Sequence, residues 1–125
     1  MEPTQLVHPP DAVSSSVQHY RDVVIAFLTQ HAQGKYAYGE IERELILDRE
    51  RDHYLVLDVG WQGEYTRVYG PSIHLDIINE KVWLQCNHTE TDVPAELMQR
   101  GVAREDIVLG KHPPYKRPYT GYAVE

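Results

Sequence analysis

The sequence predicts an α+β fold: one two-layer domain in which an antiparallel meander sheet of four to five strands packs on an N-terminal helix, followed by a short C-terminal helix and a proline-rich arm. Three observations predict it. Apolar residues first recur every three or four positions, they then alternate with polar residues along short runs, and prolines gather near the C-terminus. A chain of 125 residues that is 42% hydrophobic can bury one core and has little room for a second domain.

The predicted domain covers residues 14–125. Residues 1–13 are predicted to be a flexible leader, because they contain three prolines and few large apolar side chains. The serines at 14–16 then offer N-cap oxygens for the first turn of a helix. The buried face of that helix is predicted from helical spacing to consist of Val17, Tyr20, Val24, Phe27, Leu28 and His31.

The middle of the chain is predicted to form antiparallel strands, because its apolar and polar residues alternate. A compact charged turn at residues 48–52 indicates a first hairpin, and the pair Asn79–Glu80 indicates a second with a two-residue connection. Gly70 and Pro71 are expected to end one strand before the next begins. The expected strands cover residues 41–47, 53–60, 65–69, 73–78 and 82–86.

The last third of the chain begins with a short helix. Thr91 or Asp92 can cap it, Pro94 suits its first turn, and Gly101 ends it. Residues 111–119 contain three prolines, which exclude them from a central strand. We therefore expect an extended arm that lies over a surface.

Composition excludes several classes of protein. No apolar run approaches the 18 residues of a membrane span, and the early acid of the N-terminus excludes a secretory signal. The single cysteine, Cys86, cannot form an internal disulfide, which fits a reducing cytoplasm. The net charge of −7 argues against non-specific binding to duplex DNA, and no phosphate loop is present.

One low-ranking polar site emerges from the strand pattern. His74 and Asp76 share a strand face, so they could supply two metal ligands or an acid–base couple, with His53 or His88 as a third member. The alternative is that these side chains lie on the hydrated face of the sheet or bond to neighbouring strands. No zinc-binding helix motif or paired-cysteine motif accompanies them, so we expect no metal, no cofactor and no catalytic residue.

The arm concentrates cations and aromatic rings, and it is our candidate interaction region. Cations and aromatic rings together can bind single-stranded nucleic acid, but three cations without a supporting basic face are too few for strong binding. Docking on the acidic stretch 40–58 of the same chain, or on a neighbouring subunit, is favoured. Nine tyrosines also hint at association, and we expect a homodimer or higher homo-oligomer. The residues concerned are Lys111, His112, Tyr115, Lys116, Arg117 and Tyr119.

Several segments between about residue 17 and the end are informative through their order and spacing. They are Asp52-His53-Tyr54 to Val59-Gly60-Trp61, Tyr69-Gly70, Ile73-His74-Leu75-Asp76-Ile77, Lys81-Val82-Trp83-Leu84-Gln85, Thr89-Glu90, Gly101-Val102, Glu105-Asp106-Ile107-Val108-Leu109-Gly110, His112-Pro113-Pro114, Arg117 and Tyr119-Thr120-Gly121-Tyr122-Ala123-Val124. In this order and spacing the chain resembles the XisI family, with the leader as an addition. The resemblance implies an accessory factor that controls excision of the fdxN element in cyanobacterial heterocyst differentiation, together with an XisH-type, nuclease-like partner. It implies no catalytic residue or cofactor.

The sequence therefore predicts a non-enzymatic XisI-type factor that acts through protein contacts. Two alternatives remain open at this point. A DNA-binding regulator would need the arm to merge with Arg43, Arg49, Arg51 or Arg67 into one basic stripe. A small metal-dependent enzyme would need His74, Asp76 and a partner such as His53 to converge.

Overall fold

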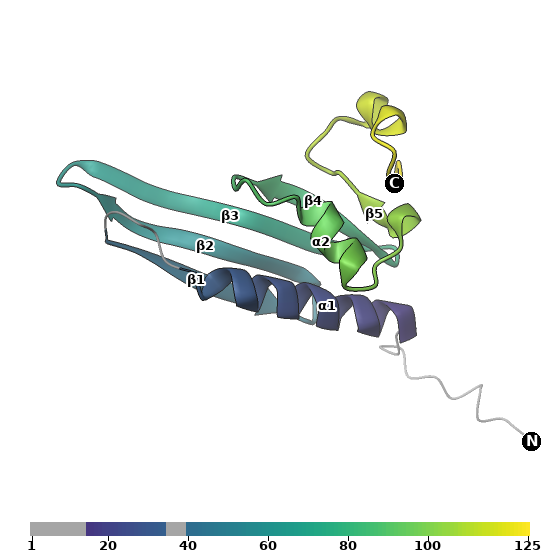
Figure 1. Ribbon diagram of the computed structural model, residues 1–125, viewed down its shortest axis with the longest axis horizontal. Helices are drawn as coiled ribbons and strands as arrows, with labels where there is room; N and C mark the ends of the chain where they lie inside the picture. The colour runs from purple at the N-terminus through teal and green to yellow at the C-terminus, as the bar shows by residue number, and fades with distance from the viewer. Residues whose placement is uncertain (1–14, 35–39) are drawn as a thin grey trace, which may run out of the picture.

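The computed structural model describes residues 15–34 and 40–125, and it confirms the predicted α+β fold (Figure 1). One helix, α1, packs on a five-stranded sheet whose strand order follows the sequence. The predicted leader, residues 1–13, lies outside the described residues. The elements are α1 (Ser15–Ala32), β1 (Glu40–Asp48), β2 (His53–Gln62), β3 (Thr66–Ile78), β4 (Lys81–Asn87), α2 (Val93–Gln99) and β5 (Ile107–Val108), with short 3₁₀ turns at Arg104–Asp106 and Pro114–Tyr119.

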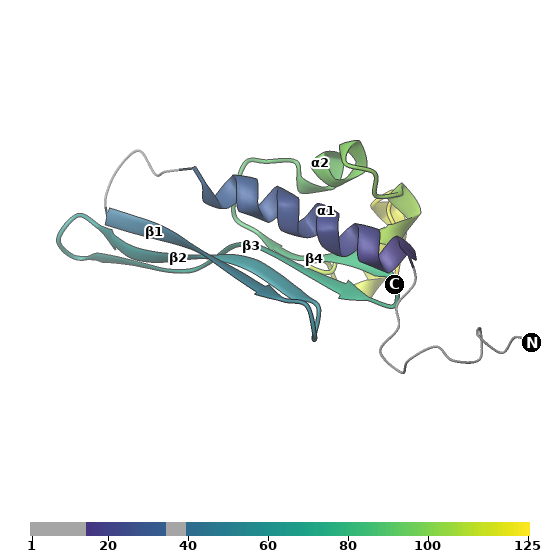
Figure 2. The same cartoon turned by 90° about the horizontal axis from the view of Figure 1, so that it is seen from below.

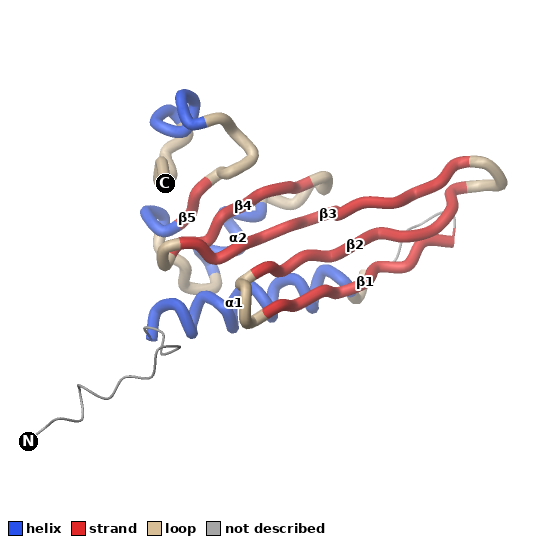
Figure 3. The backbone as a smooth tube through the Cα atoms, turned by 180° about the vertical axis from the view of Figure 1, so that it is seen from behind, coloured by secondary structure: helices blue, strands red, loops and turns tan. Residues whose placement is uncertain are grey.

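The core lies between the helices and one face of the sheet. The apolar stripe of α1 is buried as its spacing predicts, and Val24 and Leu28 are fully buried. Figure 2 shows α1 and α2 on the same side of the strands. The core residues of the strands alternate with outward-facing ones, as in Tyr54 and Val56 of β2. We call the sheet surface opposite α1 the open face; Figure 3 shows β1, β2 and β3 from that side.

The long β2–β3 hairpin extends past the end of α1 (Figure 2). Trp61, Tyr65 and Tyr69 lie on this projecting part and are exposed. Arg67 stacks on two of these rings, with its guanidinium carbon 5.3 Å from the Trp61 ring centre and 5.9 Å from that of Tyr69. The projecting part thus presents aromatic groups to solvent and has no helix over it.

The connection between β3 and β4 has the predicted two-residue form. Asn79 and Glu80 have φ angles of 52° and 65°. Positive φ at both central residues is typical of the type I′ turn, whose twist matches that of the strands. The second predicted hairpin is therefore confirmed.

The predicted break at Gly70 and Pro71 is wrong, because β3 runs without interruption through both residues. The register with β2 shifts between Val56 and Leu57, which leaves Ser72 as an extra residue. A proline has no N–H to donate, and a bulge is a place in a sheet where that loss is tolerated. Ser72 compensates locally, since its hydroxyl donates to the Val56 carbonyl at 3.4 Å.

The sheet is mixed rather than wholly antiparallel, because β5 pairs with β4 in parallel. The chain leaves β4, passes through α2 and returns in the same direction, which is what a parallel neighbour requires. The α2 helix begins as predicted, with the Asp92 carboxylate accepting from the Ala95 N–H at 3.2 Å, and Gly101 follows its end with φ of 103°.

The arm is not extended as predicted, because residues 114–119 form a 3₁₀ helix. Proline at the start of a helical turn costs nothing, since the first N–H groups have no partner inside the turn. Beyond it, the Ala123 N–H donates to the Ile107 carbonyl at 2.8 Å and fastens the C-terminus beside β5. None of the helices in residues 15–34 and 40–125 combines the length and apolar character needed to cross a membrane.

Candidate functional site

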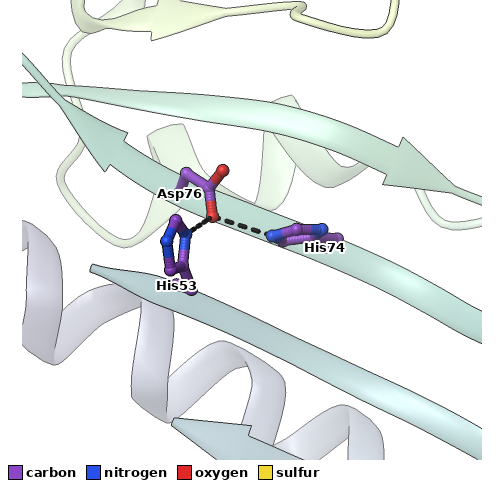
Figure 4. Close-up of side chains that lie close together, drawn as sticks. All are labelled: His53, His74 and Asp76. Carbon is purple, nitrogen blue, oxygen red and sulfur yellow. Dashed lines mark hydrogen bonds and ion pairs between the residues drawn. The ribbon is translucent and has the colours of Figure 1, made fainter. Parts of the chain in front are cut away.

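Three of the polar-site candidates from the sequence meet on the open face (Figure 4). His53 is the first residue of β2, and its Cα partner on β3 is Asp76. His74 precedes Asp76 by two residues, so both side chains leave the same face of β3. The pairing of β2 with β3 therefore brings His53, His74 and Asp76 together.

A single carboxylate oxygen is the centre of this cluster. Asp76 Oδ1 lies 2.8 Å from His53 Nδ1 and 2.8 Å from His74 Nε2. Because an ionised carboxylate only accepts, both imidazoles donate to it. The second oxygen, Oδ2, accepts from Gln85 Nε2 at 3.1 Å. The Asp76 side chain is 7% exposed, and both of its oxygens are hydrogen-bonded.

The electrostatics of the cluster favour a positive charge beside Asp76. The hydrogen bond to Asp76, and then the charge of that carboxylate, raise the pKa of His53. The His53 side chain is 51% exposed and that of His74 is 29% exposed. The cluster can therefore exchange protons with solvent, and it can offer two ring nitrogens and one carboxylate oxygen to a cation.

His88, the other candidate for the third position, lies apart from the cluster. It follows β4, where its Nδ1 is 3.2 Å from the Pro71 carbonyl. The Cys86 thiol lies 3.7 Å from the His88 ring, and burial raises the pKa of that thiol against the opposing charge of Lys111. Cys86 is thus a poor nucleophile at neutral pH.

The polar segment after β4 caps local structure. Asn87 Oδ1 accepts from the Thr89 N–H at 2.9 Å. Thr89 Oγ1 in turn accepts from the Thr91 N–H at 3.2 Å. These bonds fix the backbone between β4 and α2.

The candidate interaction region lies beside β4. Arg117 packs against β4: its guanidinium carbon stacks 5.0 Å from the Trp83 ring centre and its Nε donates to the His112 carbonyl at 3.0 Å. A Cβ on Gly110 would lie 2.9 Å from the Trp83 ring, so the chain passes close against that indole. The exposed members of the region are Lys111, Tyr115, Lys116 and Tyr119, whereas His112 is half-buried.

Replacing Arg117 with alanine is expected to loosen the arm. The loss of stacking and of the bond to His112 should lower the free energy of unfolding by about 1 kcal/mol. In a Trp61→Phe background, which leaves Trp83 as the reporter, emission should shift to longer wavelength as water reaches the indole. Lys116→Ala is the matched control and should change neither quantity. Unchanged emission in the Arg117→Ala protein would contradict this docking.

Two features of the open face were not predicted from the sequence. Gln85 completes the hydrogen bonds of Asp76, and Arg67 stacks on Trp61 and Tyr69. The register between β3 and β4 shifts between His74 and Leu75, so simple alternation does not align Gln85 with Asp76. The sequence signal for the stacked group was the spacing of Arg67 and Tyr69, which are two residues apart and therefore share one face of the strand.

Comparisons with known proteins are consistent with the fold. The family described as XisI protein matches residues 15–124. A search of curated proteins found no match. The crystal structure of a XisI-like protein from Anabaena variabilis ATCC 29413 is 46% identical, with a TM-score of 0.81, and covers 87% of this chain and 99% of that chain.

A second crystal structure extends the likeness. It is that of the fdxN element excision controlling factor XisI from Anabaena variabilis ATCC 29413, at 30% identity and a TM-score of 0.76, and it covers 89% of this chain and 100% of that chain. Sequence and structure thus agree over nearly the whole described domain. The resemblance predicted from the sequence is confirmed, and the chain belongs to the XisI family.

Proposed function

We propose that this protein is an accessory factor that controls excision of the fdxN element, or of a similar element, in the cytoplasm of a heterocyst-forming cyanobacterium. The observation that carries the proposal is the match to the fdxN element excision controlling factor, which spans all of that chain. The match to the XisI family over residues 15–124 supports it. The protein acts through contacts with other proteins and has no catalytic step of its own.

The chemistry of the buried polar groups supports a non-enzymatic role. His31 Nε2 lies 3.2 Å from Ser72 Oγ, which is the spacing of a catalytic serine and its base. Ser72, however, is 4% exposed and its hydroxyl donates to the Val56 carbonyl. Burial, and then the charge of Arg43, lower the pKa of His31. This pair therefore joins α1 to the bulge of β3 and is closed to a substrate.

The partner we propose is an XisH-type, nuclease-like protein. A protein that handles DNA needs a basic surface, and an acidic partner complements it. Glu40, Glu42 and Glu44 are exposed on the open face of β1, the free edge strand of the sheet, and the chain carries a net charge of −7. We also propose that the protein self-associates as a homodimer or higher homo-oligomer.

The arm supplies the aromatic part of the proposed contact. Tyr115 is 71% exposed and Tyr119 is 89% exposed, while Arg117, which lies between them in the sequence, is held on Trp83. Exposed tyrosines on a fixed support lose little conformational freedom on binding, which makes them effective interface residues.

The alternative of a DNA-binding regulator is less well supported. A DNA-binding surface requires one continuous basic stripe. The arginines concerned instead make separate contacts in different parts of the fold, and two of them pair with carboxylates. The contacts are Arg43 with the His31 carbonyl, Arg49 with Asp22, Arg51 with Asp48, and Arg67 with Trp61 and Tyr69.

Affinity capture with an XisH-type protein from the same organism tests the proposal. The wild-type chain should retain that protein at micromolar concentration, and Tyr115→Ala/Tyr119→Ala should weaken retention at least about tenfold, as loss of central interface aromatics does. Tyr65→Ala/Tyr69→Ala removes equally exposed rings at the far end of the sheet and is the matched control. Loss of binding in the control variant alone would refute the arm as the contact. Failure of the wild-type chain to associate would refute the partner.

A further inference from the structure

We propose that His53, His74 and Asp76 bind a divalent transition-metal ion of the Zn²⁺ class on the open face. This proposal is independent of the proposed partner, and it departs from the sequence-based expectation of no metal. It rests on three observations: the ligand set, the support behind it, and its access to solvent.

The ligand set suits such an ion. The nitrogen and oxygen atoms that face one another in the cluster all lie within 4.8 Å of each other, and the carboxylate oxygen is 2.8 Å from each ring nitrogen. Ligands bound at about 2.0–2.1 Å to one tetrahedral ion lie about 3.3 Å apart, so small side-chain rotations make room for it. Two imidazoles with one carboxylate favour Zn²⁺ and its neighbours over Mg²⁺ or Ca²⁺, which prefer all-oxygen sites.

The support behind the ligands is already in place. Gln85 Nε2 donates to Asp76 Oδ2 at 3.1 Å, which orients the carboxylate and leaves Oδ1 toward the two rings. Carboxylates that bind metals are held in this way by hydrogen bonds from the next layer of residues. Both strands are paired on either side of the cluster, so the backbone positions of the ligands are fixed by the sheet.

The site is open on one side. His53 is half exposed and His74 is almost one-third exposed, whereas Asp76 lies beneath them. An ion can therefore enter from solvent without opening the fold. Three protein ligands leave a fourth tetrahedral position for water or for a group from a bound protein, as in zinc sites that are not closed by four side chains.

In the metal-free protein, His53 and His74 each donate an N–H hydrogen bond to Asp76 Oδ1, the oxygen that would bind the ion. Each ring must move or release that proton before its nitrogen can bind metal, because only an unprotonated nitrogen is a ligand. The side chains must also rotate slightly, because the 2.8 Å contacts are shorter than the spacing of two ligands on one ion, and Asp76 Oδ1 then becomes a ligand instead of a hydrogen-bond acceptor. The ion thus replaces two hydrogen bonds with two coordinate bonds at the same nitrogens.

Zinc titration of the full-length chain, made without a polyhistidine tag and freed of metal with chelator, tests the proposal. We expect calorimetry with Zn²⁺ to show one ion per chain at low micromolar affinity, and a rise in thermal midpoint with added Zn²⁺. His53→Asn and His74→Asn should each weaken binding at least about tenfold. Mg²⁺ at the same concentration should produce neither effect.

His88→Asn is the matched control, because His88 lies beside Cys86 and could hold zinc on its own. Its affinity for Zn²⁺ should stay within about twofold of the wild-type value. Co²⁺ provides a second readout, since its visible absorption reports nitrogen and oxygen ligands without thiolate. Absence of binding by the wild-type chain at 100-fold its own concentration, or equal affinity in the His53→Asn and His74→Asn proteins, would overturn the proposal; so would loss of binding in His88→Asn alone.

Discussion

Replacing Leu28 with alanine should lower the free energy of unfolding by about 3 kcal/mol, the largest single effect that we expect in this protein. Leu28 is fully buried on α1 and contributes to the core between that helix and the sheet. Truncation removes buried methyl groups and leaves a cavity. Because other side chains of α1 stay packed in the core, the helix cannot shift to fill that cavity. Urea unfolding followed by circular dichroism should show a lower midpoint with an unchanged slope.

Leu47→Ala provides the matched control. Leu47 lies on the edge strand β1 and is 38% exposed, so the same truncation removes less buried surface. Its cost should stay below about 1 kcal/mol. Equal losses in the two variants would mean that α1 does not pack on the sheet as described.

Replacing Arg21 with methionine should cost about 2–3 kcal/mol, because it leaves a partly buried carboxylate without its cation. Arg21 of α1 donates from Nε and Nη2 to the two oxygens of Asp52, at 2.7 and 3.0 Å, and the hydroxyl of the buried Tyr54 donates to Asp52 Oδ1 at 2.6 Å. The side chains of Arg21 and Asp52 are 15% and 17% exposed. This bidentate pair joins the first helix to the turn between β1 and β2.

A double-mutant cycle with Asp52→Asn tests the pairing. Asparagine tolerates the φ of 60° at this position, so the backbone is preserved. Arg21→Met/Asp52→Asn should be more stable than Arg21→Met alone, because no charge is then left unpaired. Additive losses, with no coupling between the two positions, would contradict the pairing.

The same pair contributes to the acid sensitivity of the fold. Burial would raise the pKa of Asp52, but the bonds from Arg21 and Tyr54 outweigh it and hold that pKa below its ordinary 3.8. A carboxyl whose pKa is lowered by folding contributes stability above pH 3.8, and that contribution is lost as the pH falls through the folded pKa. The stability gap between the wild-type protein and Arg21→Met should therefore close as the pH falls and Asp52 becomes protonated in both folded proteins.

The elements predicted correctly are those that local pattern determines. The stripe of α1, the alternation in β2 and the Asn79–Glu80 turn each depend on neighbours within a few residues. The break expected at Pro71 was wrong because that prediction also considered only neighbouring residues. A proline locally predicts the end of a strand, whereas pairing with β2 before and after Pro71 carries β3 through it.

The candidate site was predicted in part. Spacing along β3 put His74 beside Asp76, but it could not decide between His53 and His88. That choice depends on the pairing between β2 and β3, which places His53 opposite Asp76. The bond from Gln85 depends in turn on the shifted register of β4, and no periodicity in a single strand encodes it.

At the projecting end of the β2–β3 hairpin, the residues exposed to solvent are separate from the residues that pack beneath α1. Substitutions at Trp61, Tyr65 or Tyr69 alter exposed rings and leave the packing beneath α1 intact, so their cost in stability is small. Gene copies that share this domain can therefore diverge at the tip while keeping the same scaffold.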